Sequence, residues 1–170
     1  MIRIAIDGPG GAGKSTIAKL VGNELGLEYI DTGAMYRAIG LKLNREGIAP
    51  EDVESIHNIL SKTSIDFVEG KIILDGDDVS DIIRTQEISK LASTYSQIPE
   101  VRTKLVDIQR RIAEGKNVIM DGRDIGTNVL VNAELKIFLT ADPMIRARRR
   151  YEQLKAKGVN AVLDHIYAEI

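Results

Sequence analysis

Cysteine is absent from this 170-residue sequence, which excludes a disulfide framework and a thiolate metal site. No apolar run approaches the roughly 18 to 20 residues that cross a bilayer. Aromatic residues make up 4% of the chain and the formal net charge is −2, so the sequence lacks a basic, aromatic-rich surface for nucleic acid. We therefore expect no membrane partner and no nucleic-acid partner.

A candidate signal peptide is also lacking, because the first predicted strand begins within two residues of Met1. The absence of cysteine permits a cytoplasmic location, and this is the location that we expect. The remaining composition is that of an ordinary globular protein, with 44% hydrophobic residues. The length suits one compact domain over residues 1–170, which we expect to be a monomer.

Arginine is concentrated in the second half of the chain, most densely in "RARRR" at 146–150. One interpretation places these side chains on solvated helix faces. The other is an anion site, because guanidinium groups bind phosphate through paired hydrogen bonds. The sequence by itself leaves both interpretations open.

Apolar periodicity predicts strands alternating with helices. The run "IRIAID" at 2–7 is typical of a buried strand, and apolar residues at three- and four-residue steps predict a helix over 14–25. Between 64 and 80, two β-branched runs separated by "EG" and followed by "DG" predict an antiparallel hairpin. Further strands are expected at 27–31, 117–121 and 134–140, and further helices at 33–47, 50–62, 85–97, 99–115, 142–158 and 161–170.

This alternation predicts an α/β fold with helices on both faces of a mostly parallel sheet. Ligands of such sheets bind at the carboxyl ends of the strands. The segments "GPGG", "DTGAMYR" and "DGRDIG" each follow a predicted strand, so we expect them to meet in one crevice.

The stretch "GPGGAGKST" at 8–16 matches the pattern G-x-x-x-x-G-K-[ST]. Glycines leave room for backbone N–H groups to close around phosphate oxygens, and the helix that follows adds its positive N-terminal end. Lys14 would reach the outer phosphates, Ser15 would ligate Mg²⁺ directly, and Thr16 would add a hydroxyl to the inner phosphate. The alternative is a glycine-rich turn without a ligand. The predicted ATP-binding residues are Gly8, Pro9, Gly10, Gly11, Ala12, Gly13, Lys14, Ser15 and Thr16.

The loop alone does not separate ATPases, GTPases and small-molecule kinases. An N/T-K-x-D segment, which GTPases use to read the base, is missing after residue 121. Two further strand-end segments suit a kinase that holds two nucleotides. Two alternatives remain, which are a P-loop kinase with another small-molecule acceptor and a regulatory module that binds nucleotide without transferring phosphate.

Together with this loop, the segments "DTGAMYR", "IRTQEIS" and "DGRDIGT" resemble the bacterial cytidylate kinase family of the P-loop nucleoside monophosphate kinases. The resemblance covers nearly the whole chain in the same order. It implies transfer of the γ-phosphate of ATP to CMP or dCMP with Mg²⁺ as cofactor. It also implies a three-layer αβα fold, an inserted CMP-binding subdomain over about 32–98 that contains the hairpin, and the start of a lid over about 146–170.

Several side chains match positions with roles in that family. Thr32 stands near the monophosphate, Tyr36 would pack on the acceptor nucleotide, and Arg37 and Arg123 would hold the acceptor phosphate. Tyr36 could instead be plain helix packing. Arg84 and the arginines at 146, 149 and 150 resemble parts of the phosphate and ATP side, with Arg146 expected on ATP. The catalytic set implied by the resemblance is Lys14, Arg37, Arg123 and Arg150.

Ser93, Arg102 and Asp124 resemble the group that reads the cytosine edge in that family. A carboxylate accepts from the exocyclic amine of cytosine, and a guanidinium donates to its carbonyl. Uracil would leave these groups unpaired, which favours CMP over UMP. Ser93 could also be a helix-surface hydroxyl, and Arg123 and Asp124 could form a structural salt bridge only.

Asp121 ends the apolar strand "NVIMD" and would orient Mg²⁺ through water, although it could be a simple strand-end acid. Family members continue past the position of Ile170 through an arginine- and aspartate-rich lid segment and a last strand. The resemblance therefore implies that this lid and strand are missing, and we expect poor turnover from the 170 residues alone.

Overall fold

A computed structural model describes residues 1–170 of the chain. Its centre is a four-stranded parallel sheet in the order β2 (Glu28–Asp31), β6 (Val118–Gly122), β1 (Arg3–Asp7) and β7 (Leu135–Phe138). Asp7 pairs in register with Gly122, and Asp31 pairs with Asp121. The carboxyl ends of the three strands that precede the predicted loops are therefore level with one another.

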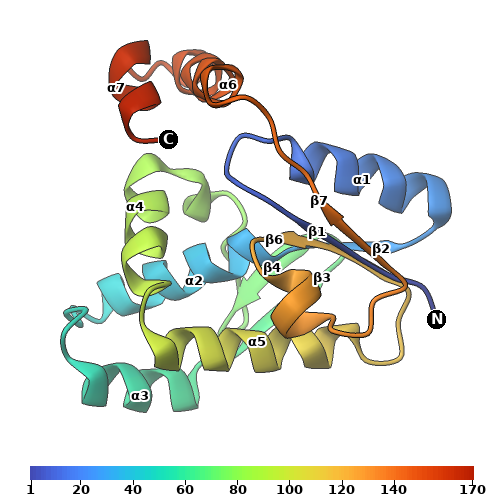
Figure 1. Ribbon diagram of the computed structural model, residues 1–170. Helices are drawn as coiled ribbons and strands as arrows, with labels where there is room; N and C mark the ends of the chain where they lie inside the picture. The colour runs from blue at the N-terminus through green and yellow to red at the C-terminus, as the bar shows by residue number, and fades with distance from the viewer.

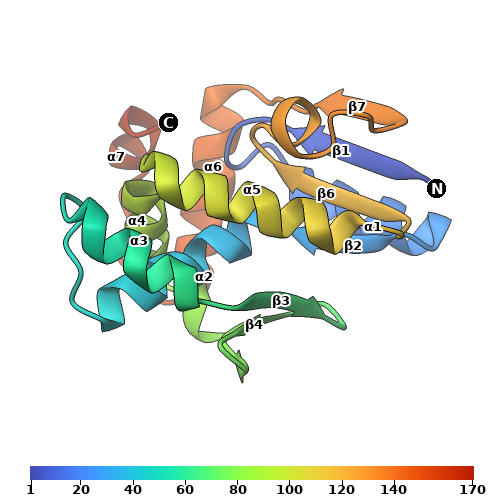
Figure 2. The same ribbon diagram turned by 90° about the horizontal axis from the view of Figure 1, so that it is seen from below.

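Helices cover both faces of this sheet (Figures 1 and 2), which confirms the predicted three-layer α/β fold. Ile4, Ile6 and Ile119 pack on one face with α1 (Lys14–Leu25). Ala5 and Met120 point to the other face, into the main core with α2 (Thr32–Arg45) and α5 (Pro99–Ala113). The period of two along each strand produces this division.

The predicted hairpin forms as β3 (Ile65–Val68) and β4 (Lys71–Leu74), and a short third strand, β5 (Asp77–Asp78), extends it. Positive φ angles at Glu69 and Gly70 make the tight reversal between the first two strands. The inner side chains of this small sheet join the main hydrophobic core rather than forming one of their own. They are Ile65, Phe67, Ile72 and Leu74.

Three helical segments surround the small sheet and α2: α3 (Val53–Lys62), η1 (Ile82–Arg84) and α4 (Gln86–Tyr95). Helix α4 lies directly against α2 at Gly40, where a Cβ atom would be 3.0 Å from the backbone nitrogen of Ala92. This close approach brings the hydroxyl-bearing face of α4 near the sheet edge.

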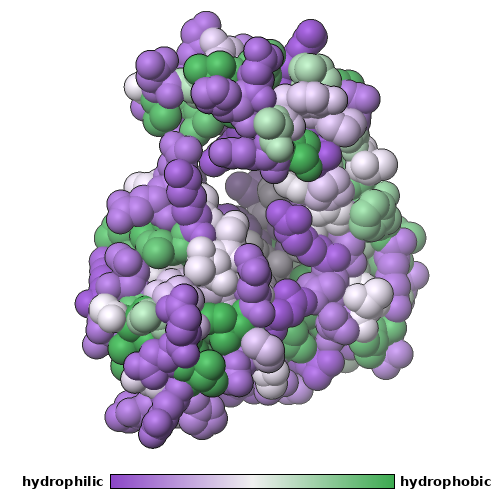
Figure 3. Space-filling view, turned by 60° about the vertical axis from the view of Figure 1, so that its left-hand side comes forward, coloured by the Kyte–Doolittle hydropathy of each residue, from purple (hydrophilic) through white to green (hydrophobic).

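The chain ends in α6 (Pro143–Ala156) and α7 (Leu163–Ala168), both predicted as helices. They form a small cluster of their own around Ala147, Leu154 and Ile166. Figure 1 places them beyond α4 and the start of α1, and Figure 3 shows a hollow with many hydrophilic residues around it below this end of the molecule. No helix is both long and apolar enough to span a membrane.

The segment after β6, for which the sequence predicted neither a helix nor a strand, contains a single π-helical turn, η2 (Ile125–Val129). Such turns give no apolar periodicity in the sequence, so pattern analysis does not reveal them.

Candidate functional site

The glycine loop joins β1 to α1, with Gly11 and Gly13 at positive φ angles of 75° and 102°. The backbone N–H groups of residues 13–16 donate no hydrogen bond within the protein. Four free donors at a helix N-terminus form an anion site. The ammonium group of Lys14 folds back on the same loop and donates to the Pro9 carbonyl at 2.9 Å.

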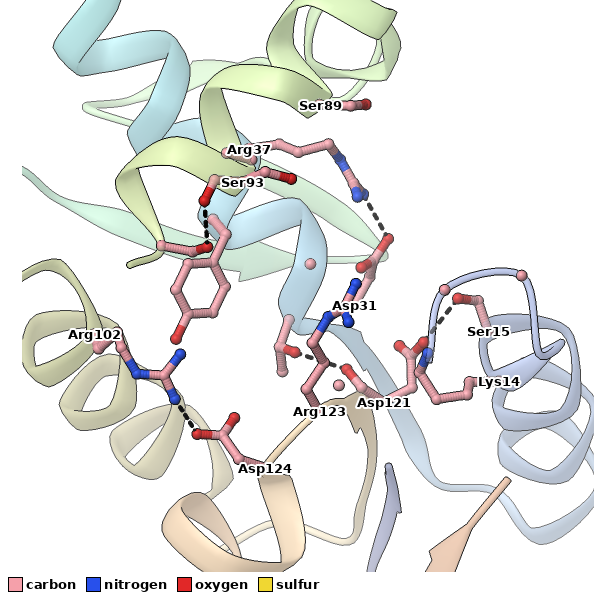
Figure 4. Close-up of a pocket in the computed structure, with 18 residues that line it drawn as sticks. Lys14, Ser15, Asp31, Arg37, Ser89, Ser93, Arg102, Asp121, Arg123 and Asp124 are labelled. Carbon is pink, nitrogen blue, oxygen red and sulfur yellow. Dashed lines mark hydrogen bonds and ion pairs between the residues drawn. The ribbon is translucent and has the colours of Figure 1, made fainter. Parts of the chain in front are cut away.

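Two cavities border this loop. The larger, of about 1270 Å³, extends along the loop between the start of α1, the segment after β7 and one side of α6. The smaller, of about 330 Å³, lies between the loop, the start of α2, α4, α5 and the end of β6 (Figure 4). Residues shared by both cavities are Gly11, Lys14, Ser15 and Arg37.

The three predicted strand-end segments meet in the smaller cavity, as expected from the parallel topology. Of the predicted site residues, those brought together here are Gly10, Gly11, Lys14, Ser15, Thr32, Tyr36, Arg37, Ser93, Arg102, Asp121, Arg123 and Asp124. Ala12, Gly13 and Thr16 line the larger cavity instead.

Asp121 is 5% exposed and lines the smaller cavity. Its carboxylate accepts from the Ser15 hydroxyl at 2.7 Å and from the Tyr29 hydroxyl at 2.9 Å. Burial raises the pKa of Asp121, and nearby Asp31 raises it further. The carboxylate is thus buried and oriented by two hydroxyl groups, and it forms no salt bridge.

Lys14 lies close to this carboxylate. Burial lowers the pKa of the Lys14 ammonium, an effect that the negative charge of Asp121 opposes and that the positive charge of Arg123 reinforces. A polyanion between these cations would favour the charged form of the lysine.

The far end of the smaller cavity holds an ion pair between Arg102 on α5 and Asp124, just after β6. The side-chain amide of Asn128 also donates to Asp124 at 2.9 Å. Tyr36 lies close enough to feel both charges, and burial raises the pKa of its hydroxyl. Figure 4 shows the Arg102–Asp124 pair on the other side of the pocket from Lys14 and Ser15, while Ser93 projects from α4.

Two more arginines lie between the two ends. Arg37 on α2 pairs with Asp31 at 3.0 Å, while its buried Nε has no hydrogen-bond partner. Arg123 extends from the end of β6 into the cavity (Figure 4) and has no carboxylate partner. Guanidinium donors without full protein partners suit an oxyanion ligand.

Two arginines of α6 contact the carbonyls of the glycine loop. Arg149 donates to the carbonyls of Gly11 and Ala12 at 3.2 and 3.0 Å and lines the larger cavity. Arg146 donates to the Gly10 carbonyl at 3.4 Å and lines neither cavity.

Some predicted residues lie outside both cavities. Gly8 and Pro9 form the base of the loop, where a Cβ on Gly8 would be 2.0 Å from the Leu139 carbonyl oxygen. Arg84 is exposed on η1 and borders a neighbouring hollow, and Arg150 is half-buried on α6. Neither Arg84 nor Arg150 lines either cavity, so the structure does not bring these two side chains to the phosphate sites where they were expected.

Other residues join the site without having been predicted. Asp31, Ser89 and Ser96 line the smaller cavity. Tyr29 holds Asp121, and Asp7 accepts backbone hydrogen bonds from η2. Asp7 and Asp31 each end a parallel strand, and this position in the sequence could have placed them at the site. No sequence pattern marks Tyr29 or the serines near α4, because their place at the site depends on packing.

Comparison with known proteins agrees with the geometry of the site. The family model for cytidylate kinase matches residues 4–170. Three curated relatives, each named cytidylate kinase, align with 99% of this chain. They come from Caldanaerobacter subterraneus subsp. tengcongensis (57% identical, 75% of its length), Caldicellulosiruptor saccharolyticus (56%, 76%) and Caldicellulosiruptor bescii (54%, 76%). This chain belongs to the cytidylate kinase family.

Proposed function

We propose that this protein transfers the γ-phosphate of ATP to CMP or dCMP, giving ADP and CDP or dCDP. Membership of the cytidylate kinase family supplies the reaction. The observation that carries the proposal is the pair of adjoining cavities that share Lys14, Ser15 and Arg37. A triphosphate on one side and a monophosphate on the other would have their reacting atoms at this boundary.

ATP fits the larger cavity because its phosphates would meet the free N–H groups of residues 13–16. Lys14 would leave the Pro9 carbonyl and bind the outer phosphates. Arg149 and Arg146 would keep the loop carbonyls turned outward, so that the N–H groups face the ligand. Charge neutralisation of this kind is the main requirement of phosphoryl transfer.

The residues present also fit Mg²⁺. No cluster of three or more His, Cys, Asp or Glu side chains forms a protein cage for a metal. Mg²⁺ needs no such cage, since it binds through one or two protein oxygens, water and substrate phosphates. The Ser15 hydroxyl would ligate it directly and Asp121 through water, and the 2.7 Å hydrogen bond between these two side chains places them side by side for this purpose. When bound, the ion would neutralise charge on the transferring phosphate.

CMP fits the smaller cavity with its phosphate toward the boundary. Arg37 and Arg123 would bind the phosphate oxygens and aim one of them in line with the γ-phosphorus of ATP. Thr32 holds the β6 end by donating to the Asp121 carbonyl at 2.7 Å, and Tyr36 would pack against the nucleoside. The attacking phosphate oxygen is already anionic, so the reaction requires no general base.

The cytosine ring would lie at the far end, against Arg102 and Asp124. Asp124 would accept from the exocyclic amine, Arg102 would donate to the ring carbonyl, and Ser93 would complete the polar edge. Uracil presents a carbonyl where cytosine has its amine, which would face the carboxylate oxygen without a proton between them. The ion pair between Arg102 and Asp124 would orient both side chains before the base binds.

Several finer assignments stay proposals on sequence grounds. We keep Arg150 as the cation that neutralises transition-state charge and Arg84 on the phosphate side, both of which require movement of α6 or η1. We also keep the subdomain limits of about 32–98, the lid start at about 146, and a cytoplasmic location. We also keep the expectation of a monomer.

The test is ADP release from ATP with CMP, dCMP, UMP and AMP as acceptors, measured with this chain and its Lys14→Ala variant. We expect CMP or dCMP to have kcat/KM values at least about 100-fold above UMP and AMP, as expected of a polar base-reading site. Lys14→Ala should abolish transfer and leave CMP affinity largely intact.

Preference for UMP or AMP would refute the base-reading assignment and point to a kinase with another acceptor. ATP binding with neither binding of CMP or dCMP nor transfer to any acceptor would identify a regulatory module. Equal loss of transfer and of CMP binding in Lys14→Ala would contradict the division into donor and acceptor sides.

A further inference from the structure

Asp7, the last residue of β1, directs its carboxylate away from the glycine loop that follows it. One carboxylate oxygen accepts from the backbone N–H of Ile125 at 2.7 Å, and the other accepts from that of Gly126 at 2.9 Å. Asp7 therefore binds two consecutive backbone N–H groups at the start of η2. Both bonds are charge-assisted, which makes them about twice as strong as neutral ones.

These two amides directly follow Asp124. The backbone of Asp124 is outside the helical region, with φ −146° and ψ 27°, so its direction is not set by regular structure. Its own carbonyl accepts from the Asn128 N–H at 2.9 Å. The chain on the C-terminal side of Asp124 is thus anchored by Asp7, while β6 anchors the chain before it.

Asp7 itself lines neither cavity. Its approach to the loop depends on Gly126, where a Cβ atom would lie 3.3 Å from the carboxylate and 3.1 Å from the Lys136 side chain. A residue in this place acts on a ligand only through the group that it positions.

We propose that Asp7 is a specificity-positioning residue, which holds Asp124 in the orientation that pairs with Arg102 and reads the base. The inference rests on the proposed CMP site and adds a residue outside the pocket to its selectivity. Because Asp7 also precedes Gly8, one residue joins the donor loop to the acceptor-reading loop.

The test is the ratio of CMP to UMP affinity, measured by calorimetry, in wild type and Asp7→Asn. Asparagine has one acceptor oxygen, so one of the two amides would face an NH2 group. We expect CMP affinity to fall about tenfold, the effect of losing one charge-assisted hydrogen bond. UMP affinity should change little, so the CMP/UMP ratio should fall by the same factor, and ATP affinity should stay unchanged.

Asp52→Asn is the matched control, because Asp52 also accepts a backbone N–H, from Ser55 at 3.0 Å, but at the start of α3 and outside both cavities. It should leave the ratio unchanged. Gly126→Ala keeps the carboxylate and pushes the loop from it, so this variant should lower the ratio as well and serves if Asp7→Asn folds poorly.

The outcomes separate the two claims. A wild-type chain without preference for CMP would refute the proposed function. A selective wild type whose Asp7→Asn or Gly126→Ala variant loses thermal stability yet keeps the CMP/UMP ratio would overturn the inference, since Asp7 would then be structural only.

Discussion

At the scale of single residues, Asp121 combines burial with a function that requires charge. It is 5% exposed and has two hydroxyl donors, from Ser15 and Tyr29, but no cationic partner within ion-pair distance. Burial raises the pKa of Tyr29, which keeps that hydroxyl protonated and able to donate. The cost of burying the carboxylate is therefore only partly offset in the free protein.

This cost predicts the pH dependence of an Asp121→Asn variant. The pKa of Asp121 is raised by folding, so its contribution to stability is present below the unfolded pKa of about 3.9 and is lost as the pH rises through the folded value. Asparagine removes the ionisation, its carbonyl oxygen accepts from one hydroxyl, and its NH2 group donates to the oxygen of the other. We expect the variant to melt a few degrees above wild type at pH 7 in EDTA, with a smaller difference at pH 4.

The same variant should lose phosphoryl transfer, because its neutral amide would no longer orient the metal's water ligands. Thermal melts at the two pH values, with a transfer assay at pH 7, check both parts. A melting temperature that falls below wild type at pH 7 would show that the hydroxyl pairs depend on the negative charge.

At the scale of elements, the shape of the acceptor cavity depends on how closely α2 and α4 approach. Gly40 allows this contact, with the backbone of Leu91 and Ala92 within 3.0 to 3.4 Å of where a Cβ atom would lie. Backbone atoms cannot rotate away as a side chain would. Helix α4 carries Ser89 and Ser93 into the cavity, and Ser96 directly follows it, so the position of α4 sets the width of the site.

Gly40→Ala is expected to push α4 outward. Overpacking lowers the free energy of unfolding by about 1–3 kcal/mol, and the better helix propensity of alanine raises it by about 1 kcal/mol. The net loss of stability should therefore be about 1 kcal/mol in a denaturant titration. KM for CMP should rise several-fold in steady-state assays while KM for ATP stays constant.

Asn44→Ala, an exposed change at the end of the same helix, is the control and should alter neither KM value. An equal rise of both KM values in Gly40→Ala would mean that the substitution disturbs the sheet rather than α4 alone.

At the scale of the whole molecule, the two cavities lie where separate parts of the chain meet. Helices α6 and α7 have their own apolar cluster and reach the rest mainly through polar contacts, such as Arg149 to the loop carbonyls and Lys157 to the Arg84 carbonyl at 2.9 Å. Contacts of this kind re-form more easily than packed apolar ones. Ligands that bridge the parts should therefore stabilise the folded state.

Binding to the folded state alone stabilises by about 2.7 kcal/mol at a ligand concentration 100 times its Kd. For a chain of this length that corresponds to a rise of roughly 5–10 °C in melting temperature. We expect CMP at that concentration to give such a rise, and a non-hydrolysable ATP analogue with Mg²⁺ to give a second one. UMP at the same concentration should give much less.

Differential scanning fluorimetry with each ligand alone and with both together measures these shifts. Competition, in which one ligand cancels the shift of the other, would contradict two separate sites.

Much of the framework was predictable from local sequence. The buried β-branched run "IRIAID", the apolar steps of α1 and the "EG" reversal at 69–70 predicted elements that the structure confirms. The glycine loop could also be predicted from local sequence. Free N–H groups and positive φ angles require a particular pattern of neighbouring residues. The meeting of three strand-end segments in one crevice was predictable as well, since the carboxyl ends of parallel strands lie at one edge of the sheet.

The sequence alone therefore determined the fold class, the phosphate loop and the family, because each depends on residues adjacent in the chain or on a pattern carried by its order. Only the tertiary structure decided that the hydroxyls of Tyr29 and Ser15 donate to Asp121 and that α4 lines the acceptor cavity. It also decided that Asp7 accepts hydrogen bonds from η2. These contacts join residues as far as 119 positions apart. Their partners are selected by the packing of helices on the sheet, and local patterns carry no record of that packing.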